Sequence, residues 1–245
     1  MAVAGIVAEY NPFHTGHAYQ LTQTRRMVGW ESAVVAVMSG NWVQQADCAV
    51  ADKWVRTRLA LMSGVDLVLE LPTVWATASA EAFARGAVTI LEGCGVVDVL
   101  SFGSECGQIP PLIQNAECLD SPAYRWELAR CLAEGRSFAA ARQEAVGILL
   151  GEETADLLSS PNNNLGVEYI RALRALGSHI RPVTVQREGD PHGSLRQEGA
   201  RSRFLSATQL RAFLKEERWG LARPYLMPGT VEVLKESWDG FPSLS

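Results

Sequence analysis

The sequence predicts an α/β fold, in which helices cover a parallel sheet, from two observations. Short apolar runs rich in Val, Ile and Leu recur with little polar alternation, as in strands buried on both faces. Segments with helical spacing lie between these runs, and such an alternation builds a parallel sheet with right-handed crossovers. The expected strands are Ala2–Ala8, Ala33–Met38, Asp66–Leu71, Val96–Phe102 and, later in the chain, Ile180–Gln186.

The remaining segments are expected to be mostly helical. Between the first four strands and up to residue 158 we expect the helices Thr15–Val28, Cys48–Ser63, Ala76–Glu92, Ala123–Ala133, Phe138–Leu150 and Glu153–Leu158. A loop over Ser159–Gly166 should lead into a helix over Val167–Leu176. Residues 187–203, rich in glycine and charge, indicate a mobile loop. A short helix should follow over Ser206–Leu214, with Ser206 at or near its N-cap.

Composition limits the class of protein. The 245 residues are 47% hydrophobic, enough to bury the core of one large or two small domains. The formal net charge of −5 excludes a polycation. The five cysteines form no CxxC pair, which argues against structural zinc, and their odd number fits reduced thiols in a cytosol. No apolar stretch reaches about 18 residues. We therefore expect a soluble cytoplasmic protein of undetermined oligomeric state.

The most informative segment begins at Gly5 and ends at His17. The first expected strand enters a loop that delivers His14-Thr-Gly-His17 to the start of a helix. Imidazoles at i and i+3 share one helical face, here where free backbone N–H groups and the helix dipole favour anions. Gly16 leaves room for a phosphate to approach the backbone. The pattern predicts a nucleotide-phosphate site built on imidazole donors, with an exposed pair or half of a metal site as the alternatives.

Polar, flexible residues follow three later strands, at Ser39–Asn41, Glu70–Pro72 and Gly103–Glu105. Each taken singly is compatible with an ordinary βα turn. Because the carboxyl ends of parallel strands meet at one sheet edge, we expect all three to share a crevice with His14 and His17.

Two further groups of residues have competing interpretations. The hydroxyls of Ser206 and Thr208 at a helix start, with Arg211 a turn later, could clasp a polyphosphate or belong to a plain capped surface helix. Lys53 and Arg56 could reach toward phosphate or tRNA. Alternatively, Arg56 forms a solvated i,i+4 ion pair with the acid four residues earlier.

Basic residues also gather late in the chain. The stretch around Arg201 and Arg203 carries more arginine and lysine than acid. It indicates either a nucleic-acid patch or a solvated helical face.

Several blocks together resemble a known family. They run in order from residue 1 to about 215 and are Gly5–Gln20, Ser39–Gln44 with Asp52–Arg56, Asp66–Pro72, Phe102–Glu105, Pro161–Asn163 with Leu165–Gly166, and Ser206–Arg211. The chain resembles the bacterial tRNA(Met) cytidine acetate ligases of the HxGH nucleotidyltransferase superfamily. The resemblance implies a Rossmann-like parallel sheet with a helical insertion and a C-terminal helical part.

The resemblance also implies a division of the chain and an activity. The nucleotide-binding core would span residues 1–120, a helical insertion 121–160, and the completion of the ATP-binding core 161–215. Residues 216–245 would form a helical tail that starts a truncated tRNA-binding region. The implied enzyme activates acetate with ATP to acetyl-adenylate, releases pyrophosphate and acetylates N4 of the wobble cytidine of elongator tRNA(Met).

The implied site combines the family pattern with the groups above. His14 and His17 would be catalytic, donating to phosphoryl oxygens, while Mg²⁺ and Arg211 take pyrophosphate charge. No protein metal site is expected. tRNA contacts would come from Lys53, Arg56, Arg201 and Arg203. The ATP contacts would be Val7, Ala8, Glu9, Tyr10, Asn11, Pro12, Phe13, His14, Thr15, Gly16, His17, Ala18, Tyr19, Gln20, Gly103, Asn162 and Arg187, together with Ser206, Thr208 and Arg211.

The chain departs from the family pattern in places. Thr15 stands where the family commonly has Asn, Gln44-Gln45-Ala46 where it has Gln-Arg-Gly, and Pro191-His192-Gly193 near its Tyr-His-Asp. Family members are usually considerably longer than this chain. Two other functions therefore stay open, an adenylyltransferase for a small phosphorylated metabolite and a nucleotide-binding module without catalysis.

Overall fold

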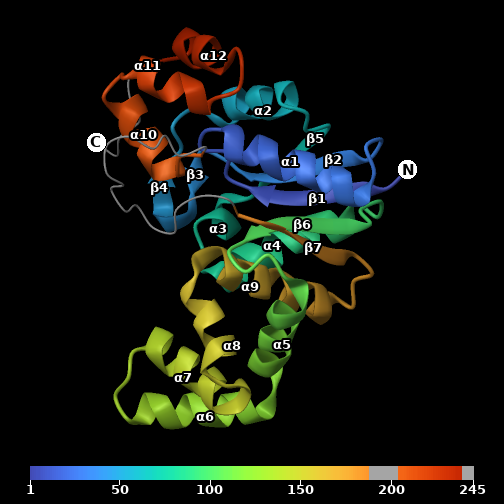
Figure 1. Cartoon of the computed structure of the whole chain (residues 1–245), viewed down its shortest axis with the longest axis vertical. Helices are drawn as coiled ribbons and strands as arrows, with labels where there is room; N and C mark the ends of the chain where they lie inside the picture. The colour runs from blue at the N-terminus through green and yellow to red at the C-terminus, as the bar shows by residue number, and fades with distance from the viewer. Residues whose placement is uncertain (188–203, 239–245) are drawn as a thin grey trace.

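A five-stranded parallel sheet forms the centre of the computed structural model, which describes residues 1–187 and 204–238 (Figure 1). All four neighbouring strand pairs are parallel. The strands, in sheet order, are β5 (Leu67–Leu71), β2 (Ala33–Ser39), β1 (Val3–Ala8), β6 (Val99–Ser104) and β7 (Arg181–Gln186). The five predicted strands and the α/β fold are confirmed. The strand order reverses between β1 and β6, where open α/β sheets form their ligand crevice.

Helices cover both faces of this sheet. They are α1 (Thr15–Val28), α2 (Lys53–Met62), α3 (Thr73–Ala76), α4 (Ala80–Gly93), α5 (Ile109–Asp120), α6 (Pro122–Ala133), α7 (Phe138–Leu150), α8 (Glu152–Asp156), α9 (Pro161–Leu176), α10 (Ala207–Lys215), α11 (Trp219–Ala222) and α12 (Thr230–Glu236). None of the helices within the described ranges is long and apolar enough to cross a membrane.

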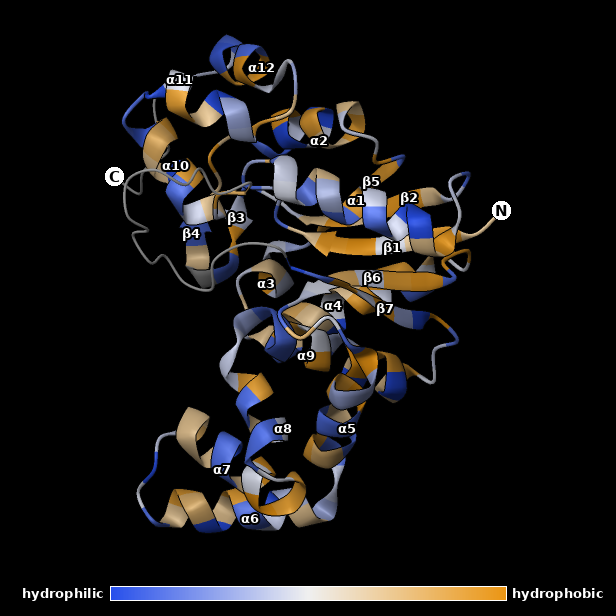
Figure 2. Cartoon of the chain, viewed as in Figure 1, coloured by the Kyte–Doolittle hydropathy of each residue, from blue (hydrophilic) through white to orange (hydrophobic). Residues whose placement is uncertain are grey.

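Two hydrophobic clusters fill the space on either side of the sheet. Along β2, Val35 and Val37 face the cluster that contains α4, α5 and α9. Val34 and Ala36 face the other cluster, which contains residues of α1, α2, α10 and α12. Figure 2 shows apolar colour along most of β1 and β6, whereas the helices alternate between apolar and polar residues. The continuous apolar runs in the sequence therefore arise because the central strands are buried on both faces.

Several helices differ from the sequence predictions. The helix expected over Ala76–Glu92 begins only at Ala80, after the separate short helix α3. The helix expected from Cys48 begins only at Lys53, because Asp52 caps it by accepting from the Val55 N–H at 2.8 Å. Residues before it form the two-stranded hairpin β3 (Trp42–Val43) and β4 (Asp47–Cys48). The loop expected over Ser159–Gly166 is wrong from its third residue, since α9 starts at Pro161.

A further difference is α5, a helix that was not predicted from the sequence. Pro110 and Pro111 lie in its first turn, where the missing N–H groups need no intrahelical partner. Asn115 is completely buried in this helix, and its side-chain amide donates to two carbonyl oxygens, those of Pro111 and Thr154. The second of these bonds joins α5 to α8.

Helices α5 to α8 form an arm that extends away from the sheet (Figure 1). Arg142 of α7 fastens the arm to α9: its guanidinium donates to Asn164 Oδ1 and to Glu168 Oε1, both at 2.7 Å. Arg171 donates to the second oxygen of the buried Glu168 at 2.8 Å. Both carboxylate oxygens are thus paired, as burial of the charge requires. The arm thereby reaches the first turns of α9.

Candidate active site at the carboxyl edge of the sheet

The loop between β1 and α1 is fixed from both sides. The Asn11–Pro12 peptide bond is cis, and Asn11 Oδ1 accepts from the Val50 N–H at 2.6 Å. Arg211 of α10 donates to the Asn11 carbonyl oxygen at 3.2 Å. Tyr10 and Phe13 are buried in the cluster between the sheet, α2 and α10. The loop therefore holds the start of α1, with His14 and His17, in a fixed position.

His14 and His17 lie at the start of α1, as the sequence predicts, and they form its capping box. His14 Nδ1 accepts from the Gly16 N–H at 3.0 Å, and His17 Nδ1 accepts from the His14 N–H at 3.3 Å. The two rings stack with centroids 3.9 Å apart. A neutral imidazole that accepts at one nitrogen carries its hydrogen on the other. Both Nε2 atoms are therefore N–H donors, and both residues are partly exposed.

A glycine is required at position 16 for a more local reason than the phosphate access predicted from the sequence. A Cβ atom at this position would lie 2.8 Å from His14 Cε1. The glycine is needed so that the His14 ring can fold back onto the helix start, and phosphate access is not the first constraint on it.

The surroundings keep both imidazoles neutral. Burial, together with the charges of the nearby Arg187 and Arg211, lowers the pKa of His14 to about 4. Burial, followed by His14 and Arg187, holds the pKa of His17 well below its usual value. A neutral, fixed pair of N–H donors results at neutral pH.

Stability of the chain is expected to fall as the pH drops from about 6.5 toward about 4. In that window the unfolded histidines bind protons and the folded ones do not, so the contribution present above pH 6.5 is lost on acidification. Urea unfolding at pH 7 and pH 5 measures this. The loss should shrink in a His14→Asn/His17→Gln double variant and persist in His179→Gln, which alters an exposed ring. Equal losses in all three proteins would contradict this account.

A second group of predicted residues converges beside the histidines. Arg187, at the end of β7, donates to Asn162 Oδ1 at 3.4 Å. Its side chain crosses Gly103, where a Cβ would lie 3.3 Å from Arg187 Cγ. The Asn162 amide nitrogen donates to Glu105 Oε1 at 2.6 Å. The structure thus brings Gly103, Asn162 and Arg187 together, as the sequence predicts for one edge of the sheet.

Glu105 belongs to a turn that the sequence predicts at this edge of the sheet, but its role as a helix cap was not predicted. Its Oε2 accepts from the Asn163 N–H at 2.8 Å, so this carboxylate caps α9 from 58 residues away in sequence. A carboxylate is favourable at a helix N-terminus. The Cys106 N–H donates to Asn163 Oδ1 at 3.0 Å and ties the same turn to the end of β6. These bonds explain why the asparagine run is helical.

The three residues of the predicted polyphosphate clasp at the start of α10 have different roles in the structure. Ser206 Oγ accepts from the Gln209 N–H at 3.2 Å and Gln209 Oε1 accepts from the Ser206 N–H at 3.1 Å, so Ser206 acts as the capping residue. Arg211 donates to Thr208 Oγ1 at 3.2 Å while it also contacts the Asn11 carbonyl. The plain cap describes Ser206, whereas Arg211 is brought to the histidine loop.

Glu9 adds a carboxylate at the end of β1. Its Oε1 accepts from the Gln44 N–H at 2.9 Å. Burial raises the pKa of Glu9, against the opposing influence of this hydrogen bond and of Arg211 and Arg56. Among the described residues, no group of three or more His, Cys, Asp or Glu side chains could hold a metal ion.

The surface role predicted for Arg56 is wrong. The side chain is completely buried, and its guanidinium donates to the carbonyl oxygens of Glu9, Ser39, Gly40 and Ala51. It ties the ends of β1 and β2 to α2 instead of meeting tRNA or pairing with Asp52. The sequence held a signal, because Leu59 and Ala60 lie three and four positions later on the same helical face.

The other predicted tRNA contacts have different positions. Lys53 is partly exposed, and its Nζ lies 2.6 Å from Glu70 Oε2. Arg201 and Arg203 lie outside the described residues, as does all of the loop predicted over 187–203 except Arg187.

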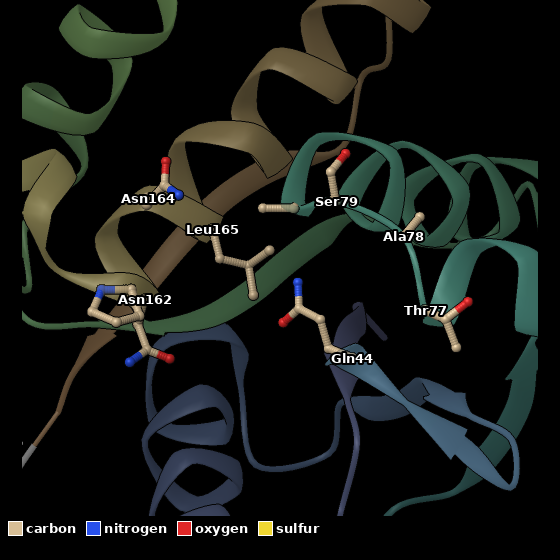
Figure 3. Close-up of a pocket in the computed structure, with 9 residues that line it drawn as sticks. Gln44, Thr77, Ala78, Ser79, Asn162, Asn164 and Leu165 are labelled. Atoms are coloured by element: carbon tan, nitrogen blue, oxygen red, sulfur yellow. The ribbon is translucent and has the colours of Figure 1, made fainter. Parts of the chain in front are cut away.

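A cavity adjoins this site. It measures about 470 Å³ and is lined by Gln44, Thr77, Ala78, Ser79, Ala80, Pro161, Asn162, Asn164 and Leu165 (Figure 3). Three elements contribute: the hairpin β3–β4, the junction of α3 with α4, and the first turns of α9.

Comparison with known proteins supports the resemblance seen in the sequence. The tRNA(Met) cytidine acetate ligases of Thermoanaerobacter sp. (strain X514) and Caldanaerobacter subterraneus are 40% and 41% identical to this chain. The matches cover 98% and 97% of this chain and 59% of each relative. The chain therefore spans less than two thirds of the length of these relatives.

Two further comparisons agree. The crystal structure of Thermotoga maritima TmcAL bound with alpha-thio ATP superimposes with a TM-score of 0.87 at 41% identity, over 96% of this chain and 56% of that one. A model of the HIGH Nucleotidyl Transferase family matches residues 1–242. The match agrees with the pair of histidines at the start of α1 and with the strand order of the sheet. It shows that the chain belongs to the HIGH nucleotidyl transferase family.

Proposed function

We propose that this chain activates acetate with ATP as acetyl-adenylate and takes part in acetylating N4 of the wobble cytidine of elongator tRNA(Met). The observation that carries the proposal is the pair of neutral imidazoles whose Nδ1 atoms are both satisfied by backbone N–H groups. Their Nε2 hydrogens remain available for phosphoryl oxygens. The names of the relatives and the ATP analogue bound to one of them support the same reading.

ATP would bind at the carboxyl edge of the sheet, across the switch between β1 and β6. Its phosphates would lie against Phe13–His17, and its base or ribose near Gly103 and Asn162. Arg187 follows β7 and Arg211 belongs to α10, and the charges of both lower the pKa of His14. Cations close enough to disfavour an imidazolium will also attract a polyphosphate.

In the first step an acetate oxygen attacks the α-phosphorus and the bond to pyrophosphate breaks. Negative charge grows on the phosphoryl oxygens and on the leaving pyrophosphate. Donors fixed in advance act on charge that appears only in the transition state, which raises the rate rather than the affinity alone. His14 and His17 supply two such donors, and Arg211 takes charge from the leaving group.

Mg²⁺ would accompany the nucleotide. The described residues form no cluster that could cage an ion, and Mg²⁺ in such sites is held largely by substrate phosphates and water. The described residues are therefore not expected to bind the ion directly.

The tRNA acceptor is suggested mainly by the names of the relatives. Lys53, Arg201 and Arg203 are the proposed contacts of this chain with phosphate groups of the RNA. A few phosphate contacts give binding that weakens steeply with salt. We therefore expect binding of tRNA at low salt that is lost at high salt.

The test is ATP–pyrophosphate exchange by the purified chain with acetate and with a panel of other acids and phosphorylated metabolites. Exchange that depends on acetate is the expected result. Turnover with a phosphorylated metabolite instead would favour the small-molecule adenylyltransferase. Binding of ATP without exchange under any condition would leave a nucleotide-binding module.

A further inference from the structure

The cavity between the β3–β4 hairpin and α9 is in contact with the proposed ATP site on two sides. Asn162 lines the cavity and also accepts a hydrogen bond from Arg187. Gln44 lines the opposite side, and its backbone N–H holds the Glu9 carboxylate. Figure 3 shows Gln44 and Leu165 extending toward each other across this space. A molecule in the cavity would lie beside a nucleotide bound at the carboxyl edge of the sheet.

The orientation of the Asn164 amide is settled by its partner. Arg142 Nη1 lies 2.7 Å from Asn164 Oδ1. A guanidinium has donors only, so the side-chain oxygen must face Arg142. Arg142 is in turn held by the buried Glu168 carboxylate at 2.7 Å. The nitrogen of the Asn164 amide, with two N–H donors, is thus the part left to meet a ligand.

The dimensions and lining fit a flat, polar heterocycle. A volume of about 470 Å³ falls in the range of small-ligand pockets, roughly 300–1,000 Å³. Pro161 and Leu165 supply apolar walls, and Gln44 and Asn164 supply amides. Of the pyrimidines, cytosine presents two neighbouring acceptors, O2 and N3, whereas N3 of uracil is a donor. An amide donor placed against N3 therefore favours cytosine over uracil.

The geometry points to this cavity as the subsite of the acceptor base, with Asn164 donating to N3 of a cytosine. The inference rests on the proposed function and adds to it the place and the reader of the acceptor. A base that enters such a cavity must turn out of its RNA loop, as in other enzymes that modify bases. The N4 amine would then be directed at the neighbouring ATP site.

The transfer step balances without a further reactant. The lone pair of N4 attacks the carbonyl carbon of acetyl-adenylate, and the bond from that carbon to the phosphate oxygen breaks. AMP leaves with the electron pair of this bond. The proton lost by the amine is taken up by the leaving phosphate.

Asn164→Asp is the sharpest test, because it keeps an oxygen for Arg142 and replaces the two donors by an acceptor. We expect acetate-dependent ATP–pyrophosphate exchange within about twofold of the wild type. Acetyl transfer to an anticodon stem-loop with a wobble cytidine should fall about 10- to 100-fold. Gln114→Glu makes the same amide-to-acid change at an exposed position of α5 outside the cavity, and it should alter neither rate.

Transfer by Asn164→Asp equal to that of Gln114→Glu would overturn the subsite. Failure of the proposed function would look different, since the wild type itself would show no acetate-dependent exchange. In that case ligand-observed NMR with free cytidine and uridine decides the subsite. Preference for cytidine that is lost in Asn164→Asp supports it, and equal responses to both nucleosides overturn it.

Discussion

Replacing His17 by alanine is expected to slow adenylate formation by roughly 100- to 1,000-fold while ATP affinity changes much less. The substitution removes one of two N–H donors aimed at charge that develops in the transition state. It also frees the backbone N–H of His14, which His17 Nδ1 now accepts at 3.3 Å. Backbone contacts from the loop before α1 should preserve most ground-state binding. His14→Ala should behave in the same way.

Rates of ATP–pyrophosphate exchange, with nucleotide affinity measured separately by calorimetry, check this expectation. The matched control is His179→Ala, which removes a histidine whose side chain is 74% exposed on the surface. Its exchange rate should equal that of the wild type. If His17→Ala kept its rate within about threefold of the wild type, the imidazoles would only shape the helix start and the mechanism would be wrong.

Replacing Arg56 by methionine is expected to lower the free energy of unfolding by roughly 3–5 kcal/mol. The methionine fills much of the volume but leaves four carbonyl oxygens without their donor, including those of Glu9 and Gly40. Burial lowers the pKa of Arg56 to about 10, so the guanidinium is still charged at neutral pH. Arg56→Lys should also destabilise, because an ammonium cannot span the same set of acceptors.

Urea denaturation provides the measurement, and a neighbouring arginine provides the control. Arg58 lies on the same helix, but its side chain is 58% exposed and pairs with Glu236 at 3.1 Å. Arg58→Met should cost no more than about 1 kcal/mol, the range of exposed ion pairs. Equal losses for the two variants would show that the buried hydrogen bonds of Arg56 contribute nothing to stability.

Much of the fold could be predicted from local pattern. The central strands at 3–8, 33–39 and 99–104 are mostly apolar runs because both faces of the sheet are covered there, and the edge strands at 67–71 and 181–186 are more polar. The start of α9 could not be predicted in this way. Its asparagines are ordinary turn residues by themselves, and the Glu105 cap comes from a distant strand end. Pro110 and Pro111 concealed α5 because prolines usually mark a boundary.

The sequence by itself determined the strand, loop and helix that place His14 and His17 at the first strand end, since those signals lie within a few residues of each other. It also carried the family resemblance, which the comparisons confirm. Only the tertiary structure decided which ring nitrogens carry hydrogen, because backbone N–H groups occupy both Nδ1 atoms. It also turned Arg56 inward and oriented Asn164 through Arg142. Arg56 and Asn164 depend on partners that are distant in the chain, and buried polar groups require such partners. The hydrogen bonds of the two histidines are local, but the rings stay neutral because of burial and the distant Arg187.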